Sequence, residues 1–244
     1  MRNWKFMLLL ICSIILSSFI MNGCSNSSDG TESAKKQGQS EKKSTSPLFG
    51  VVGIDVSGSY KGMTLKAVEI CKNIIMNANY GDEYFIRTIS SESYPPETSD
   101  GHDNTVAHER FIEIPTAPNR FNKKAKIRYL LAQRKFQAQK NNIVQFLEKM
   151  RFKPAQRTDI YGFIAAASDL FAGAPDGFRK VLMFATDLKD TASFSCSPDL
   201  SGVEVVIFEF LVDADPTKSQ NRRIEWEKRL KKWGATKVTV RPAN

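Results

Sequence analysis

The 244-residue sequence contains little of what several protein classes require. Four cysteines are too few for a fold that depends on a disulfide framework, and two histidines argue against a histidine-rich metal site. A mean hydropathy of -0.32 leaves room for one apolar segment at most, which excludes a membrane protein with several spans. No G-x-S-x-G nucleophile elbow and no glycine-rich phosphate loop is present. We therefore do not expect an enzyme or a small-molecule substrate.

The one long apolar run lies at the N-terminus, where the sequence is typical of a secretory signal. Arg2 and Lys5 precede the run Phe6–Met21, and a small residue, Gly23, follows it. This run is shorter than the roughly 20 residues that a spanning helix needs, although an uncleaved anchor remains the alternative. We expect residues 1–23 to form a signal peptide.

The residues Met21–Cys24 resemble the lipobox of bacterial lipoproteins, in which the cysteine is lipidated and becomes the new N-terminus. Gly23 and Cys24 match that motif. Met21 stands in for leucine, whereas Asn22 departs from the usual small or aliphatic residue. The resemblance implies that Cys24 is lipidated, for example with palmitate, and that the protein is exported and anchored to the bacterial cell membrane or envelope. An exported protein rarely meets nucleic acid, so we expect no nucleic-acid partner.

Residues 24–46 are polar and contain no aliphatic side chain larger than Ala34. Such a segment cannot bury enough apolar surface to offset the conformational entropy that is lost on ordering. We predict a disordered tether that spans roughly 25 Å as a flexible chain. A tether of this kind allows a lipid-anchored domain to stand off the membrane.

Residues 47–244 contain the patterns of a folded α/β domain. Near-continuous apolar runs predict buried strands at residues 48–56, 84–90, 180–186 and 203–212, with shorter strands at 110–114 and 237–240. Apolar residues at helical spacing predict helices at 63–77, 123–150, 159–171 and 219–233. Strands that alternate with helices in this way predict a doubly wound, mostly parallel central sheet with helices on both faces.

The longest predicted helix combines an apolar pattern with most of the positive charge. Its apolar residues, in rough helical register, are Ile127, Leu130, Leu131, Phe136, Ile143, Phe146, Leu147 and Met150. The net charge of the chain is +9, and residues 120–157 hold twelve basic residues against a single acidic one, Glu148. A solvated helix face accounts for such a cluster, and so does attraction to anionic lipid head groups, a cell-wall polymer or an acidic protein. The cations that we select for an anionic-surface contact are Lys123, Lys124, Lys126 and Arg128.

Oxygen-bearing side chains follow two of the buried strands. Asp55, Ser57 and Ser59 end the first strand. Asp187 follows a later strand, and Thr158 precedes the alanine-rich helix, where a threonine is also a natural N-cap. Ligands of doubly wound sheets bind outside the carboxyl ends of the strands, so we expect these five side chains to meet at one edge. Two carboxylates and several hydroxyls, without a soft ligand, suit a hard cation such as Mg²⁺ or Mn²⁺.

The sequence D-V-S-G-S at residues 55–59 resembles the DxSxS motif of von Willebrand factor type A domains, which forms their metal-ion-dependent adhesion site. Thr158 in QRTDIYGF and Asp187 in FATDLKD match the second and third loops of that site in order and spacing. The resemblance covers about residues 47–244. It implies the Rossmann-like α/β fold of that family.

The same resemblance implies a role for each residue of the site. Asp55, Ser57 and Ser59 would bind the metal or its waters. Thr158 would bind it when a ligand arrives, and Asp187 would act mostly through water. In this family a protein partner often supplies a carboxylate that completes the coordination. We therefore predict a membrane-anchored, exported protein that binds a protein partner through a divalent metal.

Three other interpretations of the site stay open. Turn chemistry at residues 55–59 and a helix cap at Asp187 would leave a structural relic. A structural envelope component held by its basic face, with a metal that only stabilises the fold, is the second. The third is a metal-dependent hydrolase, which Ser57 disfavours because phosphotransferases of the haloacid dehalogenase type need an aspartate there as general acid. Leu188 departs from the glycine that many von Willebrand type A domains have, which leaves the ligands intact.

Overall fold

The computed structural model describes residues 46–94, 104–119, 121–192, 196–210 and 213–242. The predicted signal peptide, the predicted lipidation site Cys24 and all but the last residue of the predicted tether lie outside these described residues. No helix within the described ranges is long and apolar enough to cross a membrane. All described elements belong to one structural unit, Ser44–Asn244.

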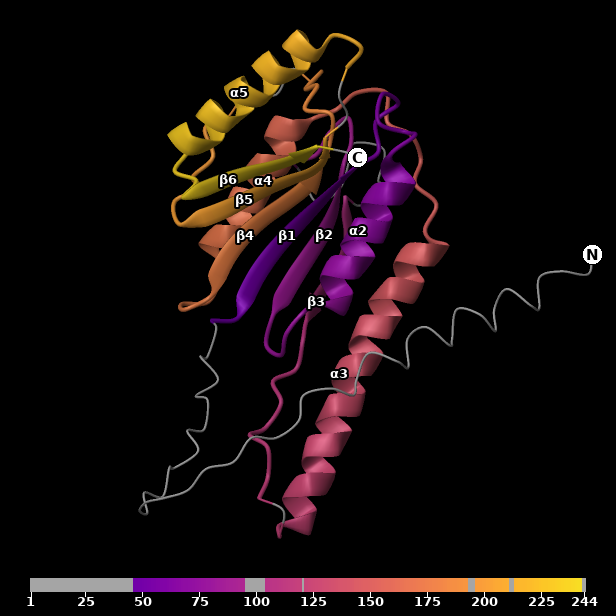
Figure 1. Cartoon of the computed structure of the whole chain (residues 1–244), viewed down its shortest axis with the longest axis vertical. Coiled ribbons are helices and arrows are strands. Elements are labelled where there is room, and N and C mark those ends of the chain that lie inside the picture. Colours follow the sequence, from indigo (N-terminus) through magenta and orange to yellow (C-terminus); the bar gives the residue numbers. More distant parts are fainter. Residues whose placement is uncertain (1–45, 95–103, 120, 193–195, 211–212, 243–244) are drawn as a thin grey trace, which may run out of the picture. The chain divides into compact units, whose positions relative to one another are not determined.

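Six strands form one sheet in the order β3-β2-β1-β4-β5-β6 (Figure 1). The strands are β1 (Leu48–Asp55), β2 (Glu83–Ile89), β3 (Thr105–Arg110), β4 (Arg179–Ala185), β5 (Val203–Phe210) and β6 (Lys237–Pro242). β1 is parallel to β2 and β4, and β5 is parallel to β4 and β6, whereas β3 is antiparallel to β2. The prediction of a doubly wound, mostly parallel central sheet is therefore confirmed.

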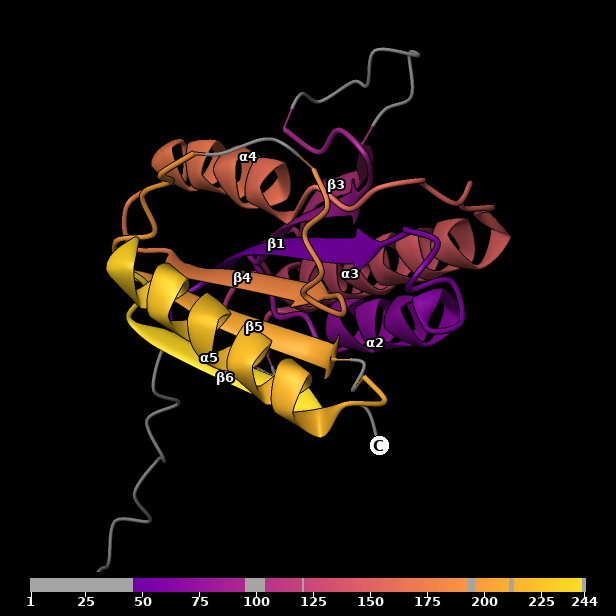
Figure 2. The same ribbon diagram turned by 90° about the horizontal axis from the view of Figure 1, so that it is seen from above.

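Helices cover both faces of this sheet (Figure 2). They are α2 (Thr64–Met76), α3 (Lys123–Lys149), α4 (Ile160–Ala172) and α5 (Pro216–Lys232). One core lies under α2 and α3 and includes Cys71 and Phe136. The other lies under α4 and α5 and includes Phe163 and Trp226. Because β1 contributes side chains to both cores, its sequence is apolar on both faces.

The prediction of a strand at residues 110–114 is wrong. The strand, β3, lies earlier in the chain and pairs with β2 as an antiparallel edge. Val106 is the one buried residue of β3, so this edge strand has the polar sequence TVAHER and lacks the apolar run that marks a buried strand. The apolar residues that suggested a strand, Phe111 and Ile112, pack on the core under α2 and α3 instead.

Two helices begin at aspartate caps. The Asp159 carboxylate accepts the backbone N–H of Gly162 at 2.7 Å, and Asp215 accepts that of Thr217 at 3.0 Å. The alternative in which Thr158 caps α4 is therefore wrong. α5 begins at Pro216 and not at residue 219, because an aspartate cap followed by proline is a strong start signal that outweighs the apolar pattern.

The longest helix, α3, ends within a residue of its predicted bounds, and its second half packs against α2. Phe136, Ile143 and Leu147 are buried in the shared core. Lys72 on α2 forms an ion pair with Glu148 near the end of α3, with 2.8 Å between Nζ and Oε1. The buried apolar residues of this half of α3 therefore pack against α2, as their helical spacing predicts.

The first half of α3 lies beyond α2. A helix rises about 1.5 Å per residue, so α3 is roughly 40 Å long and α2 roughly 20 Å. Figure 1 shows α3 continuing past the ends of α2 and the sheet. Ile127, Leu130 and Leu131 lie on this first half and are exposed, at 59%, 44% and 57%. Their helical register predicts the helix correctly but does not place them in the core.

Candidate metal centre

The predicted metal residues lie in loops that follow the central strands. Asp55 is the last residue of β1, the strand between β2 and β4. Asp187 follows β4, the parallel neighbour of β1, by two residues. The two carboxylates therefore lie at the same edge of the sheet, the carboxyl edge where doubly wound folds bind ligands.

Asp55 is fully buried and held by two hydrogen bonds. Its Oδ1 accepts the backbone N–H of Ser57 at 2.8 Å, and its Oδ2 accepts the hydroxyl of Thr186 at 2.7 Å. Burial raises the pKa of this carboxyl to about 6, although hydrogen bonds from Ser57 and Thr186 favour the charged form. A buried carboxylate whose charge is only partly compensated is a suitable ligand for a cation.

The two serines of the first loop place their hydroxyls together. The Oγ atoms of Ser57 and Ser59 lie 3.2 Å apart. Ser57 is buried, whereas Ser59 is exposed. A parallel bridge between Ser57 and Ala155, with the Gly58 N–H donating to the Ala155 carbonyl at 3.0 Å, holds the segment before Thr158 against this loop. The first and second loops of the predicted site are thus adjacent.

Thr158 is buried in this second loop. Its backbone N–H donates to the hydroxyl of Thr191 at 2.8 Å, and its carbonyl accepts the backbone N–H groups of Thr191 and Ala192. These bonds connect the second loop to the segment after β4, which contains Asp187. Since Asp159 caps α4, the Thr158 hydroxyl is not needed for that purpose.

Asp187 carries the most informative atom of the site. The residue is fully buried, and its Oδ1 accepts the backbone N–H of Lys189 at 3.0 Å. Its Oδ2 is buried and has no hydrogen-bond partner; the nearest cation, Lys189 Nζ, lies 3.5 Å away. A buried carboxylate oxygen without a hydrogen bond is costly unless something else neutralises it.

Lys189 is shared between Asp187 and a second carboxylate, Asp213, which lies closer to its ammonium group. Lys189 Nζ lies 2.5 Å from Asp213 Oδ1, and this pairing raises the pKa of Lys189. Arg222 also binds Asp213, and it donates to the carbonyl of Asp187 at 3.1 Å. The pairing with Lys189 and then Arg222 lowers the pKa of Asp213. Sequence reasoning missed this cluster, because its members lie on separate loops and a helix with no common motif.

The backbone at Leu188 explains why its position favours glycine. Leu188 has a φ of 59°, in the left-handed region that costs an L-residue roughly 1–2 kcal/mol. Its N–H donates to the Thr186 hydroxyl at 3.2 Å, and its carbonyl accepts the indole N–H of Trp226 at 3.0 Å. The side chain is buried in the core under α4 and α5. Burial and these two bonds offset the backbone strain, so the loop keeps its conformation without glycine.

The chemistry of these residues fits a hard divalent cation. The site combines two buried carboxylates with serine and threonine hydroxyls and contains no thiol or imidazole. Within the described ranges no three His, Cys, Asp or Glu residues gather as a metal cluster. The protein would thus provide two carboxylates, with hydroxyls and water completing the coordination.

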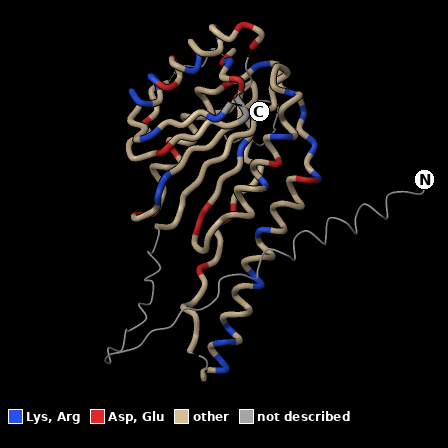
Figure 3. Tube along the Cα trace, viewed as in Figure 1, with Lys and Arg blue, Asp and Glu red and all other residues tan. Residues whose placement is uncertain are grey.

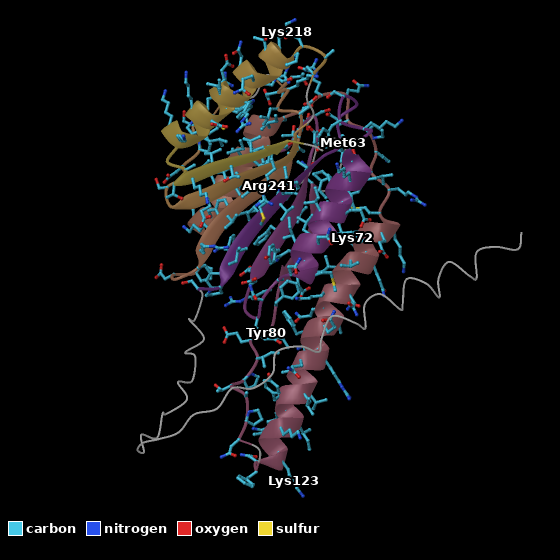
Figure 4. All side chains as sticks on the ribbon, viewed as in Figure 1. Met63, Lys72, Tyr80, Lys123, Lys218 and Arg241 are labelled. Carbon is cyan, nitrogen blue, oxygen red and sulfur yellow. The ribbon has the colours of Figure 1, made fainter. Side chains whose placement is uncertain are left out.

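The four cations predicted to contact an anionic surface lie elsewhere. Lys123, Lys124, Lys126 and Arg128 are exposed on the first turns of α3. Figure 4 labels Lys123 at the end of α3 that lies away from the sheet, and Figure 3 shows basic residues distributed along this part of the helix. The basic surface is therefore separate from the loops at the carboxyl edge.

Comparisons with known proteins find similarity at the level of structure. No protein-family model and no curated protein matches the chain. The chain is similar to the structure of a von Willebrand factor type A protein from Catenulispora acidiphila, with 16% identity, a TM-score of 0.49, and coverage of 82% of this chain and 39% of that one. It is similar to proximal thread matrix protein 1 from the mussel byssus, with 14% identity, a TM-score of 0.47, and coverage of 82% and 44%.

A third similar structure is the pilus adhesin SpaC from Lactobacillus rhamnosus GG. The identity is 14% and the TM-score 0.47, and the match covers 83% of this chain and 28% of that one. This chain thus spans less than half the length of each of the three structures. The function proposed below therefore rests on residues of this chain.

Proposed function

We propose that this chain is an exported von Willebrand type A domain that binds a protein partner through Mg²⁺ or Mn²⁺ at the carboxyl edge of its sheet. The observation that carries the proposal is the buried Asp187 Oδ2, which has no hydrogen bond. It lies in the loop after β4, beside the strand that ends in Asp55. A cation at this position would neutralise both buried carboxylates.

Each residue has a defined part in such a site. Asp55 is oriented by the Ser57 N–H and the Thr186 hydroxyl, and the Ser57 and Ser59 hydroxyls lie beside each other as further ligands. Thr158 and Asp187 complete the set from the two neighbouring loops. A bound cation supplies a positive charge with a coordination position that an acidic residue of the partner can occupy. The cluster of Lys189, Asp213 and Arg222 holds the third loop in place.

The proposed protein is anchored to a membrane by a lipid and is not an enzyme. We propose that Cys24 is lipidated and that residues 24–46 connect this anchor to the domain. We expect no catalysis, because a serine stands at position 57, where phosphotransferases of the haloacid dehalogenase type need an aspartate as general acid. Neither nucleic acid nor a small-molecule substrate is expected to bind.

A metal titration tests the site directly. A ligand that binds only the folded state stabilises it by about 2.7 kcal/mol at a hundred times its dissociation constant, so Mg²⁺ should raise the melting midpoint. The isosteric variants Asp55→Asn and Asp187→Asn should lose this rise. Asp176→Ala, which removes an exposed carboxylate outside the site, should keep it. A midpoint that Mg²⁺ and Mn²⁺ leave unmoved in the parent chain would favour the structural relic.

The partner proposal needs a second measurement. A partner captured by the parent chain should be released by a chelator and should not bind Asp187→Asn. If Mg²⁺ raises the melting midpoint but the partner still binds in the presence of a chelator and still binds Asp187→Asn, the metal only stabilises the fold. That outcome would favour a structural envelope component.

A further inference from the structure

We propose that the first half of α3, residues 123–135, is an amphipathic surface that lies on an anionic lipid bilayer. This goes beyond the proposed function, because it concerns a surface remote from the metal residues. Three features of this half of the helix support it: exposed aliphatic side chains, a surrounding set of cations, and the absence of acidic residues.

The exposed aliphatic side chains form one patch. Ile127, Leu130 and Leu131 are spaced by three and four residues, so they share a helix face about 100° wide. The buried residues Phe136 and Ile143 lie on nearly the opposite face. The patch therefore points away from the core to which α3 is attached. A soluble surface has no need for three large aliphatic residues side by side at the free end of a helix.

Basic residues surround this patch. On a helical projection Lys126 lies along one side of it, and Lys124 and Lys135 lie along the other. Lys123 and Arg134 precede and follow it on the same face. All five are exposed, and the sequence contains no acidic residue from position 114 to position 147. Figure 3 shows this half of α3 with basic residues and no acidic ones.

The combination identifies the partner as lipid. Cations alone would suit any anionic polymer or acidic protein. An aliphatic stripe between Lys and Arg side chains is the pattern of helices that lie in the plane of a membrane interface. The aliphatic groups enter the acyl boundary, while the long basic side chains extend to the head groups.

A local probe in the full chain tests the proposal without interference from an anchor. We suggest an environment-sensitive fluorescent amino acid in place of Leu131, and a control chain with the same probe in place of Leu65, which is 78% exposed on α2. The emission at position 131 should shift to the blue on vesicles of phosphatidylcholine with phosphatidylglycerol. It should not shift on phosphatidylcholine alone, and the probe at position 65 should respond to neither.

Paired variants separate the two parts of the surface. With the probe at position 131, either Ile127→Gln with Leu130→Gln, or Gln at Lys123, Lys124, Lys126 and Arg128, should reduce the emission shift on anionic vesicles about tenfold or more. Raising the salt concentration should act like the charge variant. Both variants should melt as the parent does, because they change exposed side chains. A chelator should leave the shift intact, so failure of the metal site would not affect this result.

Several outcomes would overturn the proposal. One is an absent shift on anionic vesicles, and another is an equal shift at positions 131 and 65. A shift that grows with protein concentration without vesicles would show that the patch joins two copies of the chain. A shift with polyglutamate but not with vesicles would show that an acidic protein is the partner.

Discussion

At the residue scale, the ionisation of Asp55 links the metal site to stability. Burial raises the pKa of this carboxyl to about 6, above its ordinary value of 3.8. In the unfolded chain the carboxyl ionises at the ordinary value, so the folded state binds more protons between about pH 4 and pH 6. The folded chain must therefore lose stability as the pH rises through this window, when no cation is present.

The prediction is a loss of up to about 3 kcal/mol in the free energy of unfolding between pH 4 and pH 6.5 in the presence of a chelator. Urea unfolding at several pH values measures it. Asp55→Asn is the matched control, because the amide keeps the shape of the side chain and does not ionise. If the parent and this variant show the same pH dependence, the carboxyl of Asp55 is not the source.

At the element scale, the close approach of β1 and α4 positions the first loop of the site. A Cβ atom at Gly53, two residues before Asp55, would lie 2.5 Å from the ring of Phe163 on α4. That ring is fully buried and packs against Phe184 with 5.7 Å between centroids. It has little room to move, so only glycine fits at this position of β1.

Gly53→Ala should therefore reduce the free energy of unfolding by about 1–3 kcal/mol, the range for overpacking a core. Chemical denaturation of the full chain provides the measurement. The matched control is Gly62→Ala, because a Cβ at Gly62 would meet no atom within 4 Å. Equal stability of the two variants would mean that α4 yields easily and does not constrain β1.

At the scale of the whole molecule, the proposed anchor decides where the domain acts. Cys24→Ser should release the protein from membranes or block its processing, because it removes the thiol that would carry the lipid. Two or more acyl chains hold a protein firmly at a membrane, whereas a single chain binds weakly. Fractionation of cells and the apparent size of the chain measure both effects. Cys196→Ser is the control, since Cys196 is a partly buried free thiol within the folded domain.

The opposite result has a clear meaning. A Cys24→Ser variant that stays in the membrane at full precursor length would show that the apolar run at residues 6–21 is an uncleaved anchor. In that case the domain would still be held at the membrane. The proposals for the metal site and for α3 would not change.

Most of the sheet and its helices could be predicted from sequence because their signals are local. Buried strands such as β1 and β4 are near-continuous apolar runs, and the bounds of α3 follow from apolar residues at helical spacing. The placement of Asp55 and Asp187 at one edge also follows, since parallel strands end on the same side. That these residues bind a metal stays a prediction.

Tertiary structure alone decided features that depend on distant neighbours. The polar sequence of β3 becomes a strand only because the edge of β2 is free to pair with it. Lys189, Asp213 and Arg222 meet because β4, β5 and α5 bring their loops together. The exposure of Ile127, Leu130 and Leu131 is the clearest example of such a feature. The helical pattern shows that these side chains share a face, but only the packing of Phe136 and Ile143 on the core shows that this face is turned away from it.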